Sequence, residues 1–253
     1  MNHRIVTESS AYMKQLAKGS LRGNWVNATV GMMIFYVLTV TVRNILNLLV
    51  DNSVTYTAYN GQVVNIVISG NLYDFFTTPI FSFGILAFLI VMVREGNIQF
   101  DRIFSGFEFY LKILLMTIVM GIKIILWTCL LVIPGIIAAL NYSQSYYIFF
   151  DDPSKGVLQC IHESTAMMKG NKGSLFILAL SFIGWLLLAS LASNVMLLPV
   201  SILQIGNYFN QFYSIIGYIP LAVVIVYMNT AQVHFYQLLK PLSVEGTLED
   251  ANS

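Results

Sequence analysis

Six apolar runs, each close to the length that crosses a lipid bilayer, constrain this chain more than any other feature. A bilayer core of about 30 Å needs about 20 residues of α-helix, because each residue adds 1.5 Å. The composition agrees, since 57% of the 253 residues are apolar and 10% are charged, against about 25% charged in soluble proteins. The sequence therefore predicts an all-α, polytopic membrane protein with one membrane domain, residues 1–253. The six spans are expected at about 25–48, 72–93, 111–133, 134–150, 174–198 and 212–238.

The third and fourth spans must form a hairpin. An unbroken helix from Leu111 to Phe150 would be about 60 Å long, twice the bilayer core. Pro134 supplies the turn, because proline disfavours helix at the residue before it and suits the first turn of the next helix. The fourth span is short and contains Asn141 and Gln144, so we expect it to be tilted, packed against protein, or re-entrant.

Lysine and arginine lie on alternate connections, which sets the orientation because cytoplasmic loops retain positive charge. Residues 51–71, the turn at Pro134 and residues 199–211 contain no lysine or arginine. Both termini are therefore expected in the cytoplasm. The cations of the predicted cytoplasmic side are Arg4, Lys14, Lys18, Arg22, Arg94, Arg102, Lys155, Lys169, Lys172 and Lys240.

The predicted cytoplasmic connections contain helical patterns. Residues 1–23 and 154–169 read as amphipathic helices that lie on the membrane surface with their apolar face down, the second with Ser154 as its N-cap and Gly170 after its end. Residues 97–110 follow the pattern less clearly, and residues 240–253 form a C-terminal tail. Residues 151–173, a polar stretch between two apolar runs, are thus expected to form a solvated cytoplasmic connection.

The predicted external loop, residues 51–71, contains Asn60-Gly61 between runs rich in valine, threonine and tyrosine. Asn-Gly is the preferred two-residue turn of a β-hairpin. A small external β-hairpin and an irregular loop are both compatible with this pattern. An isolated hairpin would need support from the membrane surface, another loop or a ligand strand.

Charged residues inside the spans are the best candidates for function, because an ionisable group at the bilayer centre costs at least about 2.5–3.5 kcal/mol. Lys123 lies halfway along the third span, on nearly the same face as Lys112. It can contact an anionic headgroup, a substrate or a polar side chain such as Asn141, Gln144 or Asn229, or it can snorkel. Arg43 lies toward the outer end of the first span, where snorkelling is easier.

Asp151 and Asp152 form an acidic pair at the cytoplasmic end of the fourth span. Carboxylates at a helix C-terminus are unfavourable for the helix dipole, so we expect a compensating cation such as Lys155, Lys169 or Lys172. The pair can bind a cation or a partner, or simply end the helix.

No nucleophile with its base, no phosphate-binding glycine loop and no spaced metal ligands are recognisable, so no enzyme activity, cofactor or metal is expected. The net charge of +1 gives no basic field for nucleic acid. The lipid bilayer is the one certain partner class.

Two stretches resemble a known family. Residues 133–188, with Asp151-Asp152-Pro153 and the segment 168–172, together with "LAKGSLRGNW" near the N-terminus, are similar to the bacterial integral-membrane family called domain of unknown function 975. The resemblance implies a six-span protein of the bacterial cytoplasmic membrane, distantly similar to membrane domains of glycerophosphodiester phosphodiesterases. It implies no established activity, and it makes Lys169, Asn171 and Lys172 candidate functional residues.

Two classes of function remain open. The first is a non-enzymatic envelope factor that binds a lipid headgroup, a peptide or another membrane protein, for example in self-protection against a secreted peptide. The second is a small transporter or channel in which Lys123 faces an anionic or lipidic substrate. The scarcity of carboxylates within the spans favours the first class, because ion-coupled transport commonly uses them.

Overall fold

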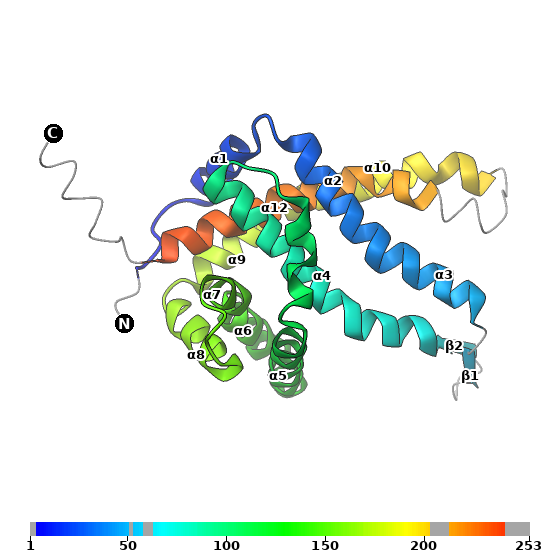
Figure 1. Ribbon diagram of the computed structural model, residues 1–253, viewed down its shortest axis with the longest axis horizontal. Helices are drawn as coiled ribbons and strands as arrows, with labels where there is room; N and C mark the ends of the chain where they lie inside the picture. Colours follow the sequence, from blue (N-terminus) through cyan, green and yellow to red (C-terminus); the bar gives the residue numbers. More distant parts are fainter. Residues whose placement is uncertain (1–3, 51–52, 58–62, 203–212, 241–253) are drawn as a thin grey trace, which may run out of the picture.

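The computed structural model describes residues 4–50, 53–57, 63–202 and 213–240 (Figure 1). It is built almost entirely of helices, and five of them are long and apolar enough to cross a membrane: Trp25–Leu49, Ile68–Glu95, Tyr110–Leu130, Lys172–Leu198 and Ile219–Leu239. The elements are α1 (Ser10–Leu21), α2 (Trp25–Tyr36), the π-helical turn η1 (Val37–Thr41), α3 (Val42–Leu49), β1 (Ser53–Thr57), β2 (Val63–Val67), α4 (Ile68–Glu95), the 3₁₀ segment η2 (Phe100–Phe107), α5 (Tyr110–Leu130), α6 (Val132–Tyr142), α7 (Ser145–Asp151), α8 (Val157–Met167), α9 (Lys172–Leu180), α10 (Ile183–Ile202) and α12 (Ile219–Leu239).

The fourth predicted span, 134–150, is not one helix. It is divided into α6 and α7, with the break at Ser143 and Gln144. At 1.5 Å per residue, α6 is only about 16 Å long, too short to cross a bilayer core. The expectation that this arm is packed against protein is met, because Tyr147, Ile148 and Phe149 of α7 are buried.

The turn before α6 comes two residues earlier than the sequence suggests. Helix α5 ends at Leu130 and Leu131 is extended, with φ of −161° and ψ of 148°. Pro134 then lies in the first turn of α6, as its missing N–H favours. A Cβ atom on Gly135 would overlap with the Thr128 side chain, so glycine lets the two arms approach closely.

Most of the long helices extend along the long axis of the molecule, fanning apart toward one end (Figure 1). In Figure 1, α2, α3, α4, α10 and α12 are drawn lengthwise, whereas α5 and α6 are seen close to end-on. Two hydrophobic clusters hold the bundle together. The larger joins α2, α4, α5, α7, α8 and α12, with Phe88, Phe149 and Val226 among its buried members. The smaller joins α1, α9 and α12.

Helices α1 and α8 are docked on protein. Met13, Ala17 and Leu21 of α1 are buried in or beside the clusters, and so are Cys160 and Ile161 of α8. The buried apolar residues therefore pack against other helices, and that α1 and α8 lie on the membrane surface stays a prediction. Sequence pattern identifies an apolar face but not the surface that covers it.

The boundaries of these two helices also differ from the predictions. Ser9 caps α1, with its hydroxyl accepting from the N–H of Tyr12 at 3.2 Å. Helix α8 begins three residues later than predicted, with Gly156 at its N-cap, because Ser154 is held in the preceding turn by Asp152. Gly170, with a φ of +88°, follows its end as expected.

Segment η2 packs along α4 with unusually close backbones. A Cβ atom on Gly84 would overlap with the carbonyl of Ile103, and one on Gly106 with the carbonyl of Ile80. Two positions without side chains therefore let a connection lie directly on a long helix. The weak helical pattern predicted for 97–110 corresponds to this 3₁₀ segment.

Strands β1 and β2 pair antiparallel, from Ser53 opposite Val67 to Thr57 opposite Val63. Asn60 and Gly61, the predicted turn, lie outside the described residues. That this segment faces the outside of a cell stays a prediction.

One end of the molecule gathers segments that are far apart in sequence. Arg94 at the end of α4 and Lys240 after α12 both pair with Asp151 at the end of α7. At the same end, the side chain of Asn171, just before α9, accepts from the N–H of Val6 at 2.8 Å. We call this the basic end. Its composition agrees with the alternating pattern of cations, although no membrane orientation is established by it.

Candidate functional site

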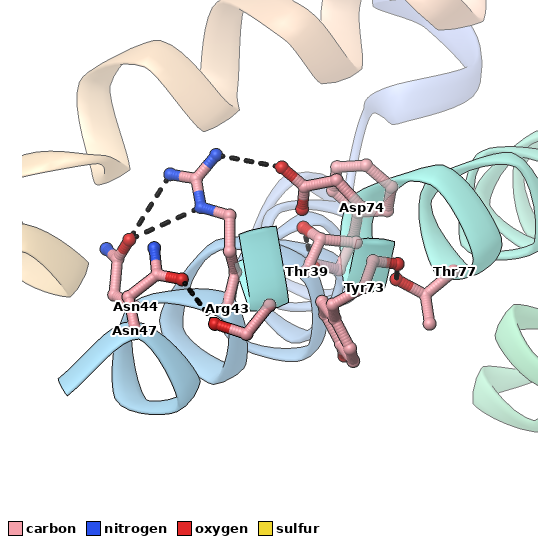
Figure 2. Close-up of polar contacts among 9 residues, drawn as sticks. Thr39, Arg43, Asn44, Asn47, Tyr73, Asp74 and Thr77 are labelled. Atoms are coloured by element: carbon pink, nitrogen blue, oxygen red, sulfur yellow. Dashed lines mark hydrogen bonds and ion pairs between the residues drawn. The ribbon is translucent and has the colours of Figure 1, made fainter. Parts of the chain in front are cut away.

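Arg43 and Asp74 form an ion pair between α3 and α4 (Figure 2). The Nη1 atom of Arg43 lies 3.0 Å from Oδ2 of Asp74, and its Nε and Nη2 atoms each donate to Oδ1 of Asn44 at 3.3 Å. The two charged side chains are about one third exposed, 34% and 32%. The guanidinium therefore already has a carboxylate and an amide as partners.

More polar contacts join the same two helices. Ser69 donates to Oδ1 of Asn47 at 3.3 Å, and a side chain at Gly70 would overlap with Asn47. The hydroxyl of Tyr73 donates to the carbonyl of Leu38, which lies in the π-helical turn. A π-helical turn leaves carbonyls outside the regular ladder, and such turns are common at functional sites. The network fixes α3 on α4.

Nearer the basic end, a cavity of about 310 Å³ lies between α2, α4, the α6–α7 break and α12. Its apolar wall comes mainly from α2 and α4. Its polar lining consists of two carboxamides, two serine hydroxyls and two tyrosines. The residues that line it are Met32, Phe35, Ser82, Ile85, Leu86, Leu89, Ser143, Tyr146, Tyr147, Asn229, Gln232 and Val233.

The two carboxamides in the cavity come from one helix. Asn229 and Gln232 are three residues apart on α12 and so lie on the same face. Neither forms a hydrogen bond with any residue in the described part of the chain. Gln232 lies eight residues before Lys240, or roughly 12 Å from the basic end along α12. The amides are thus free to bind a ligand within the depth of the bundle.

Lys123 does not line this cavity. Its Nζ atom lies over the Tyr142 ring, 5.6 Å from the centroid, so the two arms of the α5–α6 hairpin meet through a cation–π contact. The structure gives it no carboxylate partner among the described residues. Of the polar neighbours considered from sequence, Asn141 and Gln144 lie on the facing arm without contacting the lysine.

The break between α6 and α7 is held by Ser164 of α8. Its hydroxyl donates to the carbonyl of Asn141 at 2.6 Å and accepts from the N–H of Gln144 at 3.1 Å. Two backbone groups freed by the break are therefore satisfied. The side-chain oxygens of Asn141 and Gln144 are buried without a hydrogen-bond partner. Ser143, inside the break, contributes to the cavity wall.

Asp151 is the centre of the ion pairs at the basic end. It pairs with Arg94 at 2.7 Å and with Lys240, and it accepts from the Tyr236 hydroxyl at 2.5 Å. Burial by itself raises the pKa of Asp151, but the bonds from Arg94, Lys240 and Tyr236 outweigh burial and hold the pKa below its usual value.

The compensating cation expected from the sequence is found for Asp152. Its pKa is lowered first by the bond with Ser154, two residues along the chain, and also by the charge of Lys155. Lys155 itself pairs with Glu163 of α8 at 2.7 Å, and this partner raises the pKa of the lysine. Asp151 instead pairs with Arg94 and Lys240, which were not expected. Arg94 and Lys240 lie 57 and 89 residues from Asp151, so no local pattern could have indicated them.

The candidates suggested by the family resemblance separate into structural and solvent-facing residues. Asn171 is fully buried; it donates from Nδ2 to the carbonyls of Arg4 and Met167, at 3.0 and 2.8 Å. It thus fastens the N-terminal segment to the start of α9. Lys169 is exposed and Lys172 is half-buried.

The structure brings only part of the predicted set together. Arg43, Lys123 and Asp151 lie in three separate networks. The cavity residues Ser82, Tyr146 and Gln232 were missed. The available signal was the pair Asn229 and Gln232, two amides one helical turn apart in an apolar helix. Among the described residues, no group of three or more His, Cys, Asp or Glu side chains could hold a metal ion.

The fold and these sites define a multi-helix protein of membrane-like composition with a partly open cavity of mixed polar and apolar lining. The chain belongs to the family described as protein of unknown function (DUF975), whose model matches residues 7–136 and 128–243. No curated protein and no solved structure matches the chain. The distant similarity to glycerophosphodiester phosphodiesterase membrane domains stays a prediction.

Proposed function

We propose that this protein is a non-catalytic membrane protein that binds a small uncharged amphiphile, of the kind of a neutral lipid, in the cavity between α2, α4, α7 and α12. The observation that carries the proposal is the pair of unpartnered carboxamides, Asn229 and Gln232, in an otherwise largely apolar cavity. Both amides are half-buried, and a ligand that covers them must replace the hydrogen bonds of the water it displaces, which favours a ligand that can bond them.

The lining supports this ligand class. Its polar groups are amides and hydroxyls, which bond esters and alcohols, and none of its residues carries a formal charge at neutral pH. The volume of about 310 Å³ lies at the small end of ligand sites and fits a headgroup with part of one chain. The apolar wall from Met32, Phe35 and Leu89 would contact the chain.

Photocrosslinking tests the proposal. The full-length protein in nanodiscs is irradiated with a diacylglycerol that carries a diazirine on one acyl chain, and labelled peptides are identified by mass spectrometry. We expect labelling of α2 or α4 at the cavity, and at least a fivefold loss of that labelling in the double variant Asn229→Leu and Gln232→Leu.

Asn194→Leu is the matched control, because Asn194 is an exposed amide on α10 that donates to the carbonyl of Ser190 within its own helix. The Asn194→Leu variant should be labelled at the cavity to the same extent as the unaltered protein. Equal cavity labelling in all three proteins, or labelling confined to outward-facing residues, would contradict the proposal.

A small transporter is the second candidate, favoured by the interrupted helices. The α6–α7 break contributes Ser143 to the cavity, and a second interruption at Ser181 and Phe182 separates α9 from α10. Broken helices at a central site are common in transporters. The geometry gives Lys123 no place at this cavity, so a transport mechanism here would use the amides of α12. Peptide binding in self-protection stays a prediction without a specific contact to support it.

A further inference from the structure

The segment from α5 to α7 begins and ends at the basic end. Arg94, at the end of α4, pairs with Asp151, the last residue of α7. The chain between them must therefore cross the membrane an even number of times. Helix α5 and the α6–α7 arm either cross together or do not cross.

The direction of the α5–α6 hairpin relative to the long helices distinguishes between crossing and not crossing. Helices α2, α3, α4, α10 and α12 run along the long axis of the molecule, while α5 and α6 point across it (Figure 1). Four of the five helices of spanning length extend in the same general direction (Figure 1), and we take their mean direction as the membrane normal. A hairpin across them lies along the plane of the membrane.

The buried residues of α5 are unevenly distributed along the helix. Its buried residues, Ile113, Met116 and Met120, are all in its first half. The second half carries exposed apolar side chains, of which Ile125 and Leu126 are 62% and 66% exposed. The distal half of the hairpin thus leaves the bundle and contacts its own second arm.

The tip has the character of a segment in lipid. Leu130, Leu131, Val132 and Ile133 are each about two-thirds exposed, and none offers a polar side chain to a headgroup region. The backbone needs little help from water, because the N–H of Leu131 donates to the carbonyl of Trp127 at 3.1 Å and that of Gly135 to Leu131 at 3.3 Å.

The charge of Lys123 gives a physical reason for the hairpin not to cross the membrane. In a crossing helix it would lie near the bilayer centre with only the Tyr142 ring beside it, at a cost of at least about 2.5–3.5 kcal/mol. Lys112, eleven residues earlier and so on nearly the same face, lies 5.7 Å from the Phe149 ring and donates to the carbonyl of Pro153. In a hairpin that lies in the membrane plane, both ammonium groups stay at one depth.

Helix α8 shows which side of the hairpin faces water. It packs against α5 and α6, and two polar residues on it, Gln159 and His162, are exposed. Lys112 and Lys123 both face the α6–α7 arm, on which α8 lies. The lysines are therefore on the headgroup side of α5.

We propose that the α5–α6 hairpin does not cross the membrane but lies in its plane, within the lipid leaflet at the basic end, with Lys112 and Lys123 turned toward lipid phosphates. The partner of its exposed apolar surface is the acyl region of that leaflet. Four crossings then remain, formed by α2–α3, α4, α9–α10 and α12, which returns both ends of the chain to one side. The proposal does not depend on what the cavity binds.

Depth measurement by spin labelling tests it. Single-cysteine variants Leu115→Cys and Leu126→Cys are made in a Cys129→Ser, Cys160→Ala background, and the full chain is reconstituted in vesicles of phosphatidylcholine and phosphatidylglycerol. Both positions are exposed, on one face of α5 and eleven residues apart. The ratio of nitroxide collisions with oxygen and with a water-soluble nickel complex reports depth. We expect the two depths to agree within about 5 Å, against about 16 Å for a helix along the normal.

Leu187→Cys and Leu198→Cys on α10 form the matched pair, since they too are exposed and eleven residues apart. These two labels should differ in depth by about 16 Å. A difference between positions 115 and 126 as large as that between 187 and 198 would overturn the proposal. So would equal depths at 187 and 198, because the long helices would then not define the membrane normal.

Discussion

The α3–α4 and α5–α6 hairpins use the same kinds of residue and differ in what surrounds them. Each joins two apolar helices, and each contains a cation within a segment long enough to cross a membrane. Arg43 pairs with Asp74 and Asn44 on its own hairpin, whereas Lys123, among the residues that the structure describes, contacts the face of the Tyr142 ring and no carboxylate. The first charge is neutralised by protein and the second is left for its surroundings to solvate.

This difference explains the different courses of the two hairpins. A paired charge can lie along the bundle at depth, because its partner reduces the cost of desolvation. An unpaired lysine must reach headgroups or water. The hairpin with the ion pair follows the long axis of the molecule, and the hairpin with the lone lysine lies across it (Figure 1). Charge pairing, more than apolar length, separates the two.

The largest effect should come from the base of the α5–α6 hairpin, where Asp151 holds α4, α7 and α12 together. Asp151→Asn leaves Arg94 and Lys240 without a carboxylate, and we expect the free energy of unfolding to fall by about 2 kcal/mol. Asp152→Asn is the control, because Asp152 bonds only within its own turn. Unfolding by denaturant titration in detergent measures both.

The same pair of proteins gives a pH test. Because the folded-state pKa of Asp151 is below its ordinary value of 3.8, its stabilisation is present above about pH 4 and is lost as the pH falls through the folded-state pKa. The stability of the unaltered protein should approach that of Asp151→Asn at acid pH. A constant difference between them from pH 7 to pH 3 would contradict this role.

A smaller effect is expected at the α3–α4 hairpin. Arg43→Met leaves Asp74 unpaired, and because both side chains are about one third exposed the loss should be about 1 kcal/mol. The double variant Arg43→Met and Asp74→Leu should recover part of it, since no lone charge then remains. Thermal unfolding in detergent supplies the free energies for this double-mutant cycle. Additive losses would show that the two residues do not act as a pair.

The smallest effect should be that of Lys123→Met. The substitution removes one cation–π contact and one charge, and we expect stability to change by no more than about 0.5 kcal/mol. Membrane insertion should be normal, and ligand crosslinking at the cavity should be unchanged. Loss of ligand labelling or of a measured flux in this variant would show that Lys123 is a functional residue. The inferred difference between the two hairpins would then be wrong.

Much of the fold could be predicted from the sequence because lipid imposes a simple length rule. Predicted spans 25–48, 72–93 and 174–198 correspond closely to long helices of the structure, and 212–238 overlaps α12. Predicted span 111–133 also corresponds to a long helix, Tyr110–Leu130, and only 134–150 was the exception. Apolar length is necessary for crossing but gives no helix direction, and only Asn141, Ser143 and Gln144 hinted that the second arm is interrupted.

The sites were less predictable because their contacts join distant segments. The sequence identified Arg43 and Asp151 as charges that need compensation, yet Asp74, Arg94 and Lys240 became their partners only through packing. Asn171 drew attention through a motif, and its buried side chain turned out to fasten residues 4–6 to α9. Of the two cavity amides, only Asn229 was considered from the sequence, as a possible neighbour of Lys123, and Gln232 was missed.

The sequence by itself determined that this chain is composed for a membrane, that its cations lie on alternate connections, and that it is a member of one family of unknown function. The tertiary structure decided which charges are paired, where the cavity forms, and which apolar hairpin lies across the others. Composition and spacing fix the solvent that each segment prefers, because transfer free energy depends on local residues. Pairing and direction depend on contacts between residues tens of positions apart, which only the packed chain brings together.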